Sequence, residues 1–329
     1  MKLSSLKTGG RDGTLVVVSR DLARAVRVPH IATTLQQAIE DWGRSAALLA
    51  AVFDRLQAGR CEEAFDLDVA QLASPLPRAF QFLDGSVYLH HMEKARKARG
   101  AAMPPNHTTD PVMYQGLSDA FRGPREPMCF PDEGLDIDYE AEIAVVTDDV
   151  PMGTPVDGAS GHVKLVMLLN DYTLRALTKS ELPKGFGFLQ AKPTSAFSPV
   201  AVTPDELGSA WDGAKFHLTV TSSVNDRPMG RPDAGKDMFF TYPQLIAHAA
   251  ATRDLAAGTI IGAGSISNQD EDAGFGCIAE ARIHEEIAHG KARTPWLRFG
   301  DSVRIEAFDA AGASIFGAID QRIERAPAP

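Results

Sequence analysis

Residues 135–146 read LDIDYEAEIAVV, and this stretch decides the fold prediction. From Ile137 to Val145, apolar residues alternate with mainly acidic ones, which is the period-two pattern of a β-strand with one buried face. Side chains two residues apart in a strand project from the same face, roughly 6.5 Å from one another. Glu140 and Glu142 are therefore expected side by side on one face of a strand.

Two carboxylates on one strand face allow two interpretations. The face could simply be polar and open to solvent. Alternatively, Glu140 and Glu142 could be ligands of a hard cation, because carboxylate oxygens suit Mg²⁺ or Ca²⁺ and because adjacent carboxylates repel unless a positive charge lies between them. The pair alone does not decide, so any further ligands must come from elsewhere in the chain.

Length and composition indicate an ordinary soluble globular protein. The length of 329 residues is enough for one large domain or two smaller ones. The residues are 44% hydrophobic and 23% charged, which is ordinary for a soluble protein. The net charge of −10, without a basic stripe, argues against nucleic acid as a partner. Three unpatterned cysteines predict free thiols in a reducing compartment. We recognise no signal peptide and no membrane span, so we expect a cytoplasmic protein without a membrane partner.

The character of the chain changes after about residue 75. In residues 1–75, the turn TGGRDG separates two apolar runs and predicts a β-hairpin, and the apolar spacing of residues 33–59 predicts a helix. Residues 76–329 contain many short alternating runs, with clear helical spacing only at 239–255. We therefore predict an α+β, mostly β protein: a small N-terminal α+β domain (1–75) and a roll- or barrel-like β domain (76–329).

Further polar side chains fit a charged site. Asp171 ends an apolar run and Arg175 follows four residues later, so the two share a face if the segment is helical. Asp171 could equally start a turn or cap a helix. Lys192 lies among glycine, aromatic and proline residues, where its ammonium group could neutralise an oxyanion or an acidic metal site, or could extend to solvent.

A histidine pair and a glutamate offer acid–base chemistry. His90 and His91 are adjacent and cannot point the same way, so at most one is expected in a site. Glu280 is expected in a strand-like run at 277–282, where it could orient a histidine as a general base or pair with Arg282. Zinc is disfavoured because the Cys/His spacing of its sites is absent from the sequence.

The order of these motifs resembles the fumarylacetoacetate hydrolase family from about residue 80 to about residue 322. The similar segments are DYEAEIAVV, NDYTLR, GFLQAK and LAAGTIIGAGSIS. The resemblance implies a mixed β-roll, usually a homodimer, with Mg²⁺ or Ca²⁺ at the mouth of the roll. It implies that the metal carboxylates are Asp84, Glu140, Glu142 and Asp171. By the same resemblance, the other site residues are His91 as the base, Glu280 to orient it, Arg175 and Lys192 to stabilise a carbanion-like leaving group, and Tyr114 and Ser265 as substrate contacts.

The sequence departs from the family pattern where the family contacts substrate. Thr178 stands where a glutamine is usual, and the usual threonine or serine after the lysine is displaced to Thr194 or Ser195. The arginine expected after the histidine would be Arg96 or Arg99, neither of them in register. These differences leave the exact substrate open.

Three functions remain open from the sequence. The first is metal-dependent hydrolysis of a C–C bond in a diketo acid, fumarylacetoacetate or a related acylpyruvate, in tyrosine or aromatic-compound breakdown. The second is a lyase or isomerase of the same fold, such as a 2-oxo acid hydratase or decarboxylase. The third is a metal-stabilised β protein without catalysis. His91 and Glu280 favour hydrolysis, because the resemblance implies that the other branches usually place their base on a mobile lid.

Overall fold

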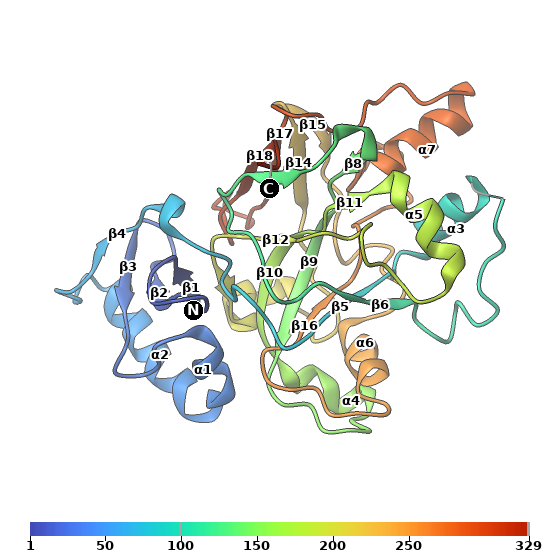
Figure 1. Ribbon diagram of the computed structural model, residues 1–329. Helices are drawn as coiled ribbons and strands as arrows, with labels where there is room; N and C mark the ends of the chain where they lie inside the picture. Colours follow the sequence, from blue (N-terminus) through green and yellow to red (C-terminus); the bar gives the residue numbers. More distant parts are fainter. Residues whose placement is uncertain (99, 328–329) are drawn as a thin grey trace.

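The computed structural model describes residues 1–98 and 100–327, with a small N-terminal part beside a larger body (Figure 1). Arg99 lies outside the described residues. The centre is an open eleven-stranded sheet. Its strands follow the order β4 (Phe65–Asp66), β3 (Arg24–Arg27), β2 (Thr14–Val18), β1 (Lys2–Leu6), β13 (Ala201–Val202), β10 (Val163–Asn170), β9 (Ala141–Thr147), β16 (Ile260–Gly262), β5 (Phe82–Gly85) and β6 (Met113–Gly116), with β12 (Ala196–Phe197) also beside β10. Neighbouring strands are antiparallel except β16 and β5.

Two smaller sheets complete the β structure. The five-stranded sheet has the order β15 (Arg227–Gly230), β14 (Val220–Val224), β17 (Ser302–Ala307), β18 (Ile319–Arg325) and β7 (Met128–Phe130). The two-stranded sheet pairs β8 (Ile137–Asp138) with β11 (Thr173–Leu174). The α-helices are α1 (Leu35–Glu40), α2 (Trp42–Gln57), α3 (Leu89–Ala98), α4 (Val156–Ala159), α5 (Arg175–Glu181), α6 (Tyr242–Ala249) and α7 (Ile278–His289). Helices α3, α5 and α7 gather at one end of the body, at the upper right of Figure 1.

The N-terminal part has the predicted hairpin and helical segment. Strands β1 and β2 pair antiparallel, and the side chain of Thr34 accepts a hydrogen bond from the amide of Gln37 to cap α1. The helical segment is divided at Asp41 into α1 and α2. Strand β1 also pairs with β13, so the central sheet runs from the N-terminal part into the body. Leu3 from β1 and Leu165 from β10 accordingly belong to one apolar cluster.

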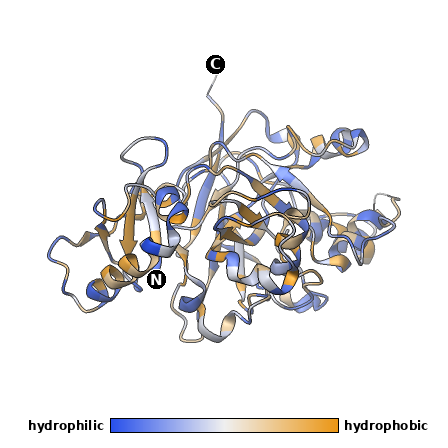
Figure 2. Cartoon of the chain, turned by 90° about the horizontal axis from the view of Figure 1, so that it is seen from below, coloured by the Kyte–Doolittle hydropathy of each residue, from blue (hydrophilic) through white to orange (hydrophobic). Residues whose placement is uncertain are grey.

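The prediction of a half-buried strand at residues 137–145 was wrong in one respect, because both faces of β9 are buried. Ile143 and Val145 pack into one apolar cluster, and Ala144 and Val146 pack into the other. The apolar colouring of the central strands, between more hydrophilic loops, is visible in Figure 2. The face that carries Glu142 therefore continues into protein interior rather than into solvent.

Helix is more frequent in the body than the sequence predicted. Helix α6 lies where it was expected, but the strand expected at 277–282 is instead the first turn of α7. Six alternating residues fit either structure, and here the helical spacing continues through His289. Asp171 precedes α5, which begins at Arg175, so the two do not share a helical face, which was one of the alternatives for this segment.

Two simpler expectations can be compared directly with the structure. The three cysteines are free, as expected. Within the described residues, none of the helices has the length and apolar character that crossing a membrane requires.

The shared core predicts that the N-terminal part and the body unfold together. Leu3 is fully buried in β1, so Leu3→Ala should lower the free energy of unfolding by about 3 kcal/mol in a single transition. The control Leu48→Ala removes a side chain that is 43% exposed and should cost less than about 1 kcal/mol. Urea unfolding followed by circular dichroism measures both variants. A Leu3→Ala variant that unfolds in two separate steps would contradict the shared core.

Candidate active site

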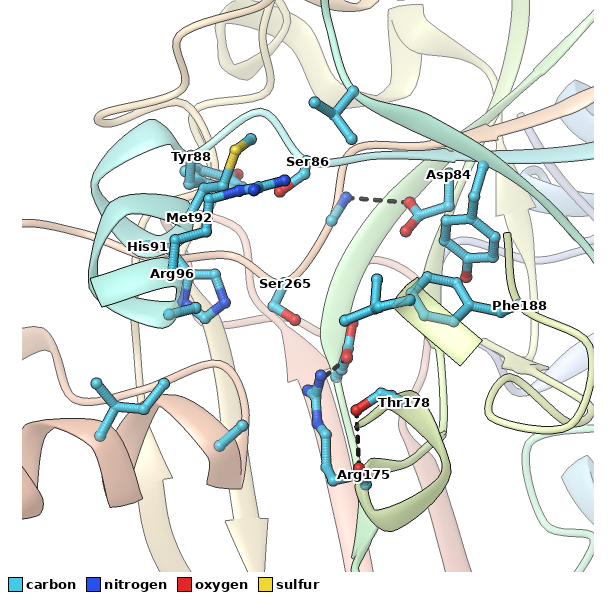
Figure 3. A pocket seen from close by; sticks show the side chains of 18 of the residues that line it. Asp84, Ser86, Tyr88, His91, Met92, Arg96, Arg175, Thr178, Phe188 and Ser265 are labelled. Atoms are coloured by element: carbon cyan, nitrogen blue, oxygen red, sulfur yellow. Dashed lines mark hydrogen bonds and ion pairs between the residues drawn. The ribbon is translucent and has the colours of Figure 1, made fainter. Parts of the chain in front are cut away.

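A cavity of about 570 Å³ opens between α3, α5 and α7, beside the ends of the central strands (Figure 3). The predicted site residues on its wall are Asp84, His91, Tyr114, Glu140, Arg175, Lys192 and Ser265. Glu142, Asp171 and Glu280 lie directly behind them, in contact with residues of the wall. The structure therefore brings all the predicted site residues together, although they come from distant segments of the chain.

Three of the carboxylates form a compact group. Asp84 lies in β5, Glu142 lies in β9 and Asp171 follows β10, and one oxygen from each lies within 4.8 Å of the others. Strand β16 runs between β5 and β9, with Gly262 opposite Asp84. A Cβ atom at Gly262 would lie 2.4 Å from Asp84 Oδ1, so glycine is needed there to leave space for the carboxylates.

The three-carboxylate group is poorly neutralised by the protein. Burial, followed by the charges of neighbouring carboxylates, raises the pKa of Asp84 to about 8 and raises the pKa of Glu142 well above its ordinary value. Glu142 Oε1 is buried without a hydrogen-bond partner among the described residues. Clustered carboxylate oxygens with an open acceptor fit a hard divalent cation such as Mg²⁺, Mn²⁺ or Ca²⁺.

Asp171 is surrounded by donors on its other side. Lys192 Nζ lies 2.5 Å from Asp171 Oδ2, and the hydroxyl of Tyr114 donates to the same oxygen. Ser195 Oγ donates to Asp171 Oδ1 over 2.7 Å, whereas Thr194 donates to a backbone carbonyl. Of the two hydroxyl residues that the sequence left open, Ser195 is therefore the one that reaches the site.

Glu140 has surroundings unlike those of the other three carboxylates. Its Oε1 accepts hydrogen bonds from Thr173 and Arg175, and its Oε2 lies 3.2 Å from Lys192 Nζ. Burial alone would raise the pKa of Glu140, but Lys192 and Arg175 together lower it below its ordinary value. Glu140 thus holds the charged side chains of Lys192 and Arg175 beside the three-carboxylate group. Its role as a metal ligand, like that of the other three carboxylates, stays a prediction.

Asp138 is the site residue that the sequence analysis missed. It is fully buried and accepts hydrogen bonds from the first two amides of α7, those of Ile278 (2.8 Å) and Ala279 (3.0 Å). It also accepts from Arg175 Nε over 2.8 Å. Asp138 therefore fixes both the start of α7 and the guanidinium of Arg175. Its signal was the alternation itself, because it lies two residues before Glu140.

Helix α7 places Glu280 next to the histidine pair on α3. Glu280 Oε2 lies 3.3 Å from His91 Nδ1, and its Oε1 accepts a hydrogen bond from Ser267. Burial alone would lower the pKa of His91, but the charge of Glu280 raises it above its ordinary value. His91 reaches the cavity wall, whereas the ring of His90 turns to Ser267. The expectation that the two rings diverge is thus confirmed.

The remaining predicted residues, Tyr114 and Ser265, also lie on the cavity wall. The ring of Tyr114 packs edge-on against Phe188, with centroids 5.2 Å apart, and Ser265 lies on the cavity wall. Thr178 and Arg96 line the same cavity. Figure 3 shows His91 and Arg96 on one side of the cavity and Arg175 and Thr178 on the other.

Comparison with known proteins gives relatives of several activities. The chain is 24% identical over 220 residues to the fumarylacetoacetase of Arabidopsis thaliana, covering 54% of this chain and 52% of the relative. It is 26% identical over 206 residues to an oxaloacetate tautomerase of Bacillus subtilis, covering 62% and 64% of the two chains. The matched part thus spans about half of the plant enzyme and just under two thirds of the tautomerase.

The fold matches solved structures over its whole length. The maleylpyruvate hydrolase of Sphingobium sp. SYK-6, solved in complex with manganese(II) and pyruvate, superposes with a TM-score of 0.66 at 18% identity, covering 99% of this chain and 100% of that one.

The sequence of this chain also matches the patterns of two protein families. Fumarylacetoacetase N-terminal domain 2 matches residues 1–78, and the fumarylacetoacetate (FAA) hydrolase C-terminal pattern matches residues 81–324. The chain therefore belongs to the fumarylacetoacetate hydrolase family.

Proposed function

We propose that this protein is a metal-dependent hydrolase that cleaves a C–C bond in a diketo acid of the acylpyruvate type, fumarylacetoacetate or a close relative. The observation that carries the proposal is the opening of two groups onto one cavity: the three-carboxylate group and the His91–Glu280 pair. The hydrolase that matches the fold was solved with manganese(II) and pyruvate, and pyruvate is a product expected from acylpyruvates.

Asp84, Glu142 and Asp171 would hold the cation, with Glu140 beside them. A divalent cation bound there would supply Lewis-acid polarisation of the two diketone oxygens. His91, oriented by Glu280, takes a proton from water, and the resulting hydroxide adds to the carbonyl carbon of the acyl group. The C–C bond then breaks and its electron pair leaves on the pyruvate-type fragment as an enolate, which takes the proton back from His91 and becomes the ketone.

Arg175 and Lys192 are the cations available to that enolate. Lys192 Nζ lies between Asp171 and Glu140, and Arg175 is held by Asp138 and Glu140. Burial would lower the pKa of Lys192, but Asp171 and Glu140 raise it above its ordinary value, so its charge is kept. Fixed positive charge at the place where negative charge develops lowers the barrier without reorganisation during the reaction.

The second candidate is an isomerase, tautomerase or other lyase-type reaction on the same scaffold. The relative named oxaloacetate tautomerase favours it, because proton transfer next to a carbonyl needs the same cation and base. We prefer hydrolysis because the His91–Glu280 pair is held between α3 and α7, whereas the resemblance implies that the other branches usually place their base on a mobile lid. Mg²⁺ or Ca²⁺ as the ion, a cytoplasmic homodimer and a role in aromatic-compound or tyrosine breakdown belong to this proposal as predictions.

A panel of substrates separates the two candidates. Purified protein is incubated with fumarylacetoacetate, short acylpyruvates and oxaloacetate, each with Mg²⁺ and with a chelator, and the products are identified by mass. Hydrolysis predicts loss of the diketo absorbance and appearance of two acid products only when Mg²⁺ is present. Conversion of oxaloacetate between its keto and enol forms, with every acylpyruvate left intact, would favour the second candidate.

Metal binding should depend on Glu142 and on pH. Burial and the neighbouring carboxylates raise the pKa of Asp84 to about 8 and also raise the pKa of Glu142, and both groups must lose their protons to bind a cation. Mg²⁺ titration calorimetry should therefore show proton release and an affinity that falls as the pH drops below about 8. Glu142→Ala should abolish binding and leave a folded protein, whereas Glu62→Ala, at an exposed position, should bind normally. Unchanged Mg²⁺ affinity in Glu142→Ala would exclude the proposed ligand set.

Lys192→Met tests the role of the buried ammonium group. The substitution keeps the aliphatic chain and removes the charge, so turnover should fall about a hundredfold or more while KM hardly changes. Lys291→Met, at an exposed position, is the matched control and should keep normal kinetics. Steady-state kinetics across a Mg²⁺ titration gives the decisive comparison. Full recovery of turnover at saturating Mg²⁺ would mean that Lys192 only balances the charge of the carboxylates.

A further inference from the structure

Ser267 lies between the two adjacent histidines and the glutamate of α7. It is fully buried in the segment after β16. Its hydroxyl donates a hydrogen bond to Glu280 Oε1, and His90 Nε2 lies 2.7 Å from the same hydroxyl oxygen. Glu280 Oε2 faces His91 Nδ1 at 3.3 Å. One continuous chain of polar groups therefore runs from His90 through Ser267 and Glu280 to His91.

The donors and acceptors in this chain can be assigned in only one direction. An ionised carboxylate accepts hydrogen bonds and cannot donate, and burial of Glu280 is outweighed by His91 and Ser267, which keep its pKa below the ordinary value. The single hydroxyl proton of Ser267 is used in the hydrogen bond that it donates to Glu280. The hydroxyl oxygen must then accept from His90, which carries its proton on Nε2.

The second oxygen of Glu280 is left for His91. Neither Glu280 Oε2 nor His91 Nδ1 has any other hydrogen-bond partner among the described residues. With Oε1 fixed by Ser267, Oε2 can accept a hydrogen bond only from His91 Nδ1, so the other ring nitrogen of a neutral His91 carries no proton. That nitrogen is the one that a general base needs.

We propose that Ser267, supported by His90, is a positioning residue that orients Glu280 and thereby selects the tautomer in which His91 acts as a base. The inference rests on the proposed function for its catalytic meaning, although the orientation of Glu280 can be measured without any substrate. His90 lies off the cavity wall, yet through its hydrogen bond to Ser267 it helps to orient the base His91.

Ser267→Ala is a clean test because it leaves every charge in place. The charges of Glu280, Arg175 and Glu140 all affect the pKa of His91, and Ser267→Ala changes none of them. The first measurement is ¹⁵N NMR of histidine-labelled, metal-free protein. In the unmodified protein, neutral His91 should carry its proton on Nδ1. In Ser267→Ala, the population should shift toward the Nε2 proton, the tautomer that a free imidazole side chain favours.

The second measurement is steady-state kinetics on the diketo acid that the wild type hydrolyses best. Ser267→Ala should lower kcat about tenfold to a hundredfold and leave KM within about twofold, in line with other residues that orient a site group. Ser267→Thr keeps the hydroxyl and should restore both the tautomer and kcat, and His90→Ala should have a smaller effect than Ser267→Ala. Ser74→Ala removes a buried, hydrogen-bonded hydroxyl outside the site and is the control for loss of stability.

The outcomes separate this inference from the proposed function. An unchanged His91 tautomer in Ser267→Ala would overturn the positioning role, and so would a loss of kcat that Ser267→Thr does not restore. A tautomer shift in Ser267→Ala, in a protein that hydrolyses none of the diketo acids, would support the positioning role and refute the proposed hydrolysis.

Discussion

The structure around the cavity depends on the repulsion among Asp84, Glu142 and Asp171, whose oxygens lie within 4.8 Å of one another inside the protein. Buried like charges are costly, and each neighbouring element reduces that cost in part. The amide of Gly264 lies 3.1 Å from Asp84 and 3.2 Å from Glu142 and donates to both. Burial and the neighbouring carboxylates still raise the pKa of Asp84 and of Glu142, as expected for a group that the protein neutralises only in part and that would suit a divalent cation.

Three carboxylates in one short stretch perform three different tasks. Glu142 belongs to the three-carboxylate group, Glu140 holds Arg175 and Lys192, and Asp138 holds Arg175 and the first amides of α7. Because these side chains alternate along one extended segment, they stand in a row from the cation site to the base. This segment thus connects the three-carboxylate group with Arg175, Lys192 and the start of α7.

The sequence predicted those features that are encoded locally. The N-terminal hairpin followed from its turn residues and apolar runs, and α6 followed from its helical spacing. The burial of both faces of β9 did not follow, because its second face belongs to an apolar cluster whose other members, such as Leu3, are distant in sequence. The strand expected around Glu280 was wrong for a related reason: six alternating residues fit a strand and the first turns of a helix equally well.

Site residues were predictable where a residue type suggested its chemistry and the resemblance to the family selected among the candidates. Carboxylates, histidines and a lysine were recognisable in the sequence, and the structure gathers them around one cavity. The roles of Asp138, Ser195 and Ser267 were not recognisable, because an aspartate or a serine acquires such a role only from its partners in space. Ser267 reaches across to α3 and α7, and no sequence spacing encodes that contact.

Crystallography with Mn²⁺ would show whether the three-carboxylate group binds a divalent cation. Crystals grown without metal and then soaked in Mn²⁺ would be measured at a wavelength where manganese scatters anomalously. We expect one strong anomalous peak, from a manganese ion bound by carboxylate oxygens of Asp84, Glu142 and Asp171. The absence of a peak among these three residues at saturating Mn²⁺, or a peak bound only elsewhere on the protein, would contradict this expectation.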